Sequence, residues 1–65
     1  MGAAEEKLEK KIKGLWAARK DCLEARVSYG RGYKGITDQL LQDADNYESQ
    51  ARDLQRILDE LREEA

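Results

Sequence analysis

The chain has no proline, histidine or phenylalanine, and Cys22 is its only cysteine. Without histidine and with a single thiol, the chain has neither a Cys/His zinc set nor an intrachain disulfide. Zinc sites and disulfides commonly stabilise small scaffolds. A chain of 65 residues buries too little surface to be stable without another stabilising contact. We therefore expect self-association to supply the missing stability. A lone thiol is also typical of a reducing compartment, so we expect a cytoplasmic or virion-associated protein.

The same absences argue against catalysis. Cys22 has no imidazole to deprotonate it, and a two-helix scaffold offers no pocket in which carboxylates, tyrosines or lysines could act. Asp43 and Asp45 resemble the start of a calcium loop, but the glycine at its sixth position and the glutamate at its twelfth are missing. We expect no enzyme, no metal site and no cofactor.

Long apolar runs are also absent. No run approaches the roughly 20 residues needed to span a bilayer, and charged residues begin at Glu5. We therefore expect neither a membrane span nor a signal peptide, and a soluble protein.

What the chain does contain is typical of long exposed helices, since 40% of its residues are charged. The predicted fold class is all-α: one domain over residues 1–65, with helices at about 4–28 and 36–64 and a loop at about 29–35. Along the second helix, apolar or small residues recur at alternating spacings of four and three, which is typical of a coiled-coil seam. This stripe comprises Ile36, Leu40, Ala44, Tyr47, Ala51, Leu54, Leu58, Leu61 and Ala65.

The first helix has a broader apolar arc than a two-stranded seam needs. Its members are Leu8, Ile12, Leu15, Trp16, Cys22, Leu23 and Val27. A wide arc favours more than one neighbour, so we expect an antiparallel hairpin completed by oligomerisation into a helical bundle, with itself or with partner helices. The predicted interface residues are Trp16, Leu23, Leu41, Tyr47, Leu54, Ile57, Leu58 and Leu61.

The only break in the chain lies at residues 28–35, where three glycines fall within six positions. Glycine permits positive φ and suits a helix end followed by a tight reversal. We favour a compact loop. A short β-hairpin pairing residues 26–29 with 33–36 is the alternative.

Two arginines lie within the apolar arc of the first helix, where a charge needs a partner or must reach the edge. If the chain folds back near Gly32, positions summing to about 64 or 65 become neighbours. This places Arg19 near Asp45 and Tyr47, and Arg26 near Asp38. We expect Arg19 to pack its stem in the seam and to pair with an aspartate or stack on Tyr47. A flexible arginine at the seam edge is the alternative.

Charge is distributed unevenly along the chain. Through Lys34 there are nine Lys/Arg and five Asp/Glu, whereas the remainder has three and nine. We favour packing of the basic half on the acidic half. The alternative is a basic surface that binds nucleic acid, which we do not favour because the chain as a whole carries net negative charge. The residues that would contact nucleic acid are Lys10, Lys13, Lys20, Arg31 and Lys34.

Several segments resemble the small head-tail joining proteins of tailed bacteriophages, the lambda W type. The segments are 8–12, 15–19, 23–25, Ser28-Tyr29 and 35–37, followed by Asp53-Leu54 and Glu60-Leu61. The resemblance implies a helix leading into a glycine-containing hairpin, a second helix, and a ring-forming role in a phage particle.

We therefore predict a non-enzymatic structural, assembly or adaptor protein, in the setting of a phage virion if the resemblance holds. The alternative is a four-helix-bundle RNA-binding regulator similar in architecture to the plasmid Rop family. An engineered bundle also suits the composition, but the Tyr/Gly loop and the arginines of the seam argue against an idealised design.

Overall fold

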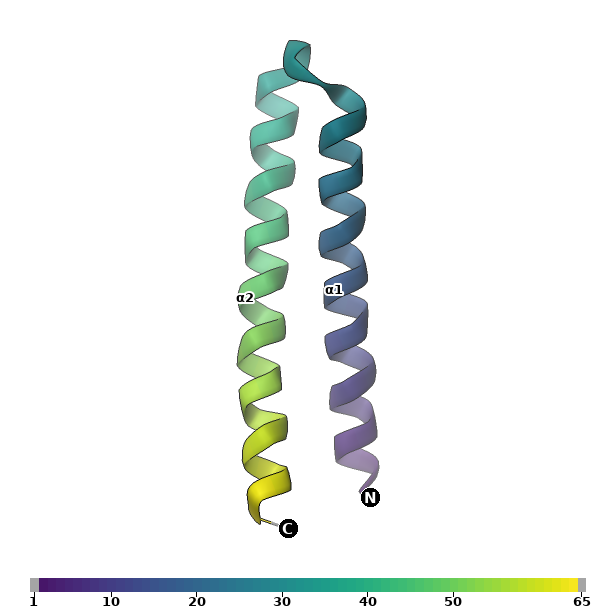
Figure 1. The fold of residues 1–65 in the computed structure, drawn as a ribbon, viewed down its shortest axis with the longest axis vertical. Coiled ribbons are helices and arrows are strands. Elements are labelled where there is room, and N and C mark those ends of the chain that lie inside the picture. The colour runs from purple at the N-terminus through teal and green to yellow at the C-terminus, as the bar shows by residue number, and fades with distance from the viewer. Residues whose placement is uncertain (1, 65) are drawn as a thin grey trace.

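The computed structural model describes residues 2–64, which form two long helices joined by a tight turn (Figure 1). Helix α1 spans Ala3–Tyr29 and helix α2 spans Lys34–Glu64, with the 3₁₀ helix η1 at Arg31–Tyr33 between them. The fold class is an all-α helical hairpin, as predicted. No strand occurs in residues 2–64, so the alternative β-hairpin is wrong.

The ends of α1 follow from local chemistry. The carbonyl of Gly2 accepts hydrogen bonds from the backbone N–H groups of Glu5 and Glu6, whose carboxylates favour the positive end of the helix dipole. At the other end, the N–H of Gly30 donates to the carbonyl of Arg26. These bonds keep α1 helical to Tyr29, at the edge of the predicted loop.

The chain reverses at a single glycine. Gly30 has φ 70° and ψ −168°, a region of backbone conformation that is essentially restricted to glycine. Within residues 2–64 it is the only residue with a positive φ, because Gly32 lies in η1 and Gly35 lies in α2. The loop predicted at 29–35 is therefore too long, since most of it is helical.

The core is one line of side chains between the two helices. Ile12 of α1 is buried, and so are Ala44, Ala51 and Leu58 of α2, which repeat every seven residues. Seven residues are close to two helical turns, so they return to the same side of α2. This confirms part of the predicted stripe as the inner side of the hairpin. Ala65 of that stripe lies outside the described residues.

The hairpin is a rod measuring 51 × 14 × 10 Å between its Cα extremes. The start of α1 and the end of α2 lie at one end of the rod, and the turn lies at the other (Figure 1). Within the described residues, neither helix combines the length and apolar character needed to cross a membrane.

Candidate helix-docking surface

Two faces of the hairpin flank its buried line, and they differ in chemistry. Residues three and four positions after a buried residue lie on opposite sides of it, because they are rotated by about 300° and about 400° around the helix. On α2, the lines that flank the core are therefore Tyr47, Leu54 and Leu61 on one side and Glu48, Gln55 and Arg62 on the other. One side is apolar and the other is polar.

Each flank of α2 shares its face with one flank of α1. Both helices turn clockwise when viewed along their own direction. In an antiparallel pair, the residues four positions after a buried residue therefore lie on the same face of the hairpin in both helices, and the residues three positions after it lie on the other face. Trp16 is four residues after the buried Ile12 and lines one shallow pocket with Gln55 and Arg62, which agrees with this geometry.

We call the two surfaces the charged face and the apolar face. The charged face comprises Glu9, Trp16, Arg19 and Leu23 of α1 with Leu41, Glu48, Gln55 and Arg62 of α2. The apolar face comprises Leu8, Leu15, Ala18, Cys22 and Ala25 of α1 with Ile36, Leu40, Tyr47, Leu54, Ile57 and Leu61 of α2.

Ion pairs connect the two helices across the charged face. Arg19 of α1 lies 3.8 Å from the carboxylate of Glu48, and Arg62 of α2 binds Glu9. Glu48 also contacts Arg52 at 3.3 Å. All these side chains are at least 30% exposed, so each pair contributes little stability. Their main effect is to cover this face with charge.

Arg19 is held in the seam, but its partners differ from the predicted ones. Its guanidinium pairs with Glu48 instead of Asp45, and it lies 5.6 Å from the ring centre of Trp16 rather than on Tyr47. Glu48 is almost one helical turn farther along α2 than Asp45. The offset arises because η1 extends the second arm of the hairpin at the turn, which shifts the register between the helices.

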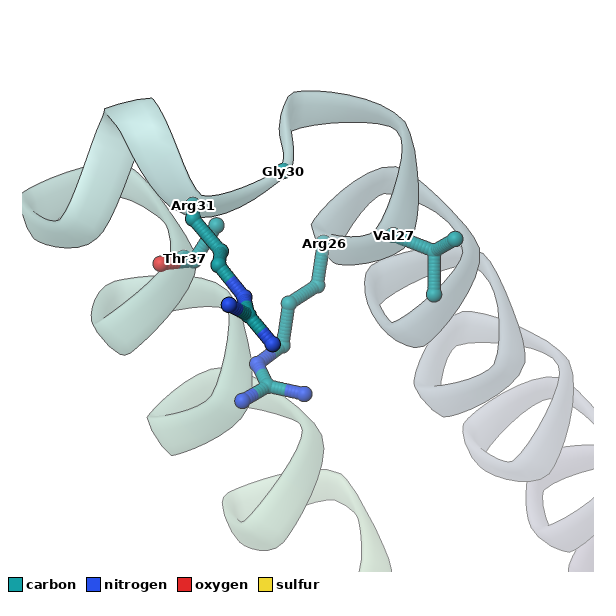
Figure 2. Close-up of a pocket in the computed structure, with 5 residues that line it drawn as sticks. All are labelled: Arg26, Val27, Gly30, Arg31 and Thr37. Carbon is teal, nitrogen blue, oxygen red and sulfur yellow. The ribbon is translucent and has the colours of Figure 1, made fainter.

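Arg26 does not pair with Asp38, which is exposed. Figure 2 shows the side chains of Arg26 and Arg31 extending from the two sides of the turn toward the same region below Gly30. They line a pocket of about 210 Å³ together with Val27, Gly30 and Thr37. Within residues 2–64, neither arginine has a carboxylate within ion-pair distance. The turn therefore carries concentrated positive charge.

The five basic residues predicted to contact nucleic acid are exposed, but they are distributed along the rod. Lys10, Lys13 and Lys20 lie along α1, whereas Arg31 and Lys34 lie at the turn. Lys20 is 3.9 Å from Glu24, which offsets part of its charge. The five cations therefore do not form one patch.

The predicted interface residues fall into three groups. Leu58 is 2% exposed and packs between the two helices, as expected for the apolar stripe of α2, so it is not available to a partner. Leu23, Tyr47 and Leu54 are half-buried. The large side chains that remain exposed are Trp16 (38%), Leu41 (38%), Ile57 (43%) and Leu61 (37%).

The residues of α2 that define the charged face were not among those predicted from the sequence. Glu48, Gln55 and Arg62 repeat every seven residues, one position after Tyr47, Leu54 and Leu61. This parallel spacing was a usable signal, because the polar line must flank the core opposite the apolar one. Glu9, the partner of Arg62, depends on the register of the hairpin and had no such signal.

Within residues 2–64, no three Cys, Asp or Glu side chains are grouped so that they could hold a metal ion. No protein-family model, curated protein or solved structure matches the chain.

Proposed function

We propose that this chain is a non-enzymatic assembly or adaptor protein that acts by helix–helix association. The observation that carries the proposal is the set of large apolar side chains, among them Trp16, Leu41, Ile57 and Leu61, that a four-residue core leaves exposed. Stable domains bury each apolar helix face against another layer. This hairpin is one layer thick and has apolar residues on both sides.

The size of the exposed surface supports the same proposal. A globular monomer of 7.5 kDa exposes about 4,200 Å², whereas this chain exposes 5100 Å². Its radius of gyration is 15.0 Å, compared with about 11 Å for a compact domain of this length. The excess surface is available for burial against another helical layer, and two such hairpins would make a four-helix bundle.

A phage particle is the setting that the lambda W resemblance adds to this proposal. The matched segments of the helices, such as 15–19 and 23–25, carry that resemblance. Residues 26–36 are helical apart from Gly30, so they lack the hairpin that the resemblance implies. The assembly function accordingly rests on the apolar surface, and it holds in the cytoplasm as well as in a virion.

The oligomeric state tests the proposal. Sedimentation equilibrium at micromolar concentrations should give a dimer or higher oligomer, and its urea midpoint should rise with protein concentration. The double variant Leu41→Gln with Ile57→Gln should associate more weakly, because it removes apolar area from both faces. The control Lys10→Gln with Lys13→Gln alters two exposed lysines and should associate like the parent. A folded wild-type monomer would contradict self-association.

The second candidate is an RNA-binding regulator, favoured by the charge at the turn. Residues 25–37 contain Arg26, Arg31 and Lys34 and no acidic residue, and Tyr29 packs edge-on against Tyr33 at 5.6 Å between ring centres. Exposed tyrosines beside arginines can stack on bases and contact phosphates. A salt-titrated gel shift tests this candidate: binding that falls steeply with salt supports it, and no binding at low salt excludes it.

A further inference from the structure

We propose that the apolar face binds a second copy of this chain, in a four-helix bundle whose two turns lie at the same end. The inference rests on the proposed function, because it names the partner and the orientation for the same exposed apolar residues. Three properties of the hairpin support it: the chemistry of the two faces, the area of the apolar face, and the charges of the two helices.

The first property is the difference between the faces. The ion pairs Arg19–Glu48 and Arg62–Glu9 cross the charged face, and burying them would remove their charges from water at a cost that the pairing does not fully offset. Within residues 2–64, no ion pair joins the two helices across the apolar face. A second helical layer therefore binds the apolar face at the lower desolvation cost.

The second property is area. A face of 51 × 14 Å offers on the order of 700 Å², close to the roughly 800 Å² per partner of a specific interface. A second hairpin covers this face along its whole length, whereas a single helix about 10 Å wide leaves part of it exposed. The dimensions therefore favour a second copy over an isolated helix.

The third property, charge, selects the orientation. Helix α1 contains seven Lys/Arg and five Asp/Glu, whereas α2 contains four and nine. When two hairpins stack on their apolar faces with the turns at opposite ends, each helix lies on its own counterpart, and the two acidic helices repel each other. When the turns lie at the same end, each basic helix lies on an acidic helix, and both contacts are attractive.

Spin labels at the turns measure the orientation. We would label Gly32→Cys in a Cys22→Ala background, because a Cβ at Gly32 meets no atom within 4 Å outside its neighbouring residues. Turns at the same end place the labels on neighbouring helical layers, about 10 to 25 Å apart. Turns at opposite ends separate them by nearly the rod length of 51 Å. A dimer with the long distance overturns the proposed orientation and leaves self-association standing.

Two matched variants test which face is used. Ile57→Asp and Leu41→Asp add the same charge to the same helix at residues that are 43% and 38% exposed, but on opposite faces. Ile57→Asp should weaken dimerisation at least about tenfold, because it places an unpaired carboxylate in the interface. Leu41→Asp should leave it within about threefold. The reverse ranking overturns the choice of face, and a wild-type monomer overturns this inference together with self-association.

Discussion

Replacing Gly30 by alanine tests the reasoning about the turn most directly. With φ 70° and ψ −168°, Gly30 has a backbone conformation that costs a residue with a Cβ about 1–3 kcal/mol. The substitution also restricts the unfolded chain, which returns about 0.4–1 kcal/mol. No atom outside the neighbouring residues lies within 4 Å of the added Cβ, so the expected cost comes from the backbone conformation alone. We expect Gly30→Ala to lower the free energy of unfolding by about 1–2 kcal/mol.

Gly35→Ala is the matched control, because it makes the same substitution five positions away. Gly35 lies in α2 with a negative φ, and its added Cβ would also meet open space. Alanine is the better helix former, so this variant should gain about 0.4–1 kcal/mol. The two variants should therefore change stability in opposite directions.

Urea unfolding followed by far-ultraviolet circular dichroism, at one fixed protein concentration, measures both changes. With a slope near 1 kcal/mol per molar urea for a chain this small, the midpoint of Gly30→Ala should fall by about 1–2 M. If Gly30→Ala matches the wild type, or if both variants are stabilised equally, then the turn does not depend on the positive φ of Gly30.

Three further variants test the packing of the two helices. Leu58→Ala should lower the free energy of unfolding by about 2–3 kcal/mol, because Leu58 is the largest fully buried side chain of the described residues; a loss below about 1 kcal/mol in urea unfolding would show that the core packs elsewhere. Ala51→Leu should lower the free energy of unfolding by about 1–3 kcal/mol, because Ala51 is 0% exposed and a larger side chain there would force the helices apart. An unchanged melting temperature would contradict close packing of the two helices at Ala51. Arg19→Met keeps an aliphatic stem but loses the ion pair with Glu48 and the contact with Trp16, so the free energy of unfolding should fall by less than about 1 kcal/mol; equal or higher stability with an unchanged oligomeric state would show that the guanidinium is dispensable.

The apolar spacing of the sequence was sufficient to predict the hairpin and the inner side of α2. Ala44, Ala51 and Leu58 are buried because their spacing returns them to one side of a helix, whatever the turn does. Exposure of Trp16 and Ile57 was likewise predictable, because two helices have too few neighbours to cover every apolar residue.

The turn and the register were not predictable in this way. Three glycines near Tyr29 and Tyr33 suggested a compact loop over residues 29–35, but helical structure continues through two of them and only Gly30 leaves the helical region. Periodicity defines which side of a helix faces its neighbour and says nothing about the offset along the axis. That offset depends on the geometry of the turn, and for this reason Arg19 meets Glu48 instead of Asp45.

The placement of the chain ends, opposite the turn, determines how the hairpin would respond to force. Tension applied between Gly2 and Glu64 acts across the helix pair, not along it (Figure 1). The contacts are therefore loaded in sequence from the open end, with Ile12 and Leu58 separating before Ala44. Pulling in an optical trap should open the hairpin progressively, like a zipper, at lower force than pulling between one end and the turn.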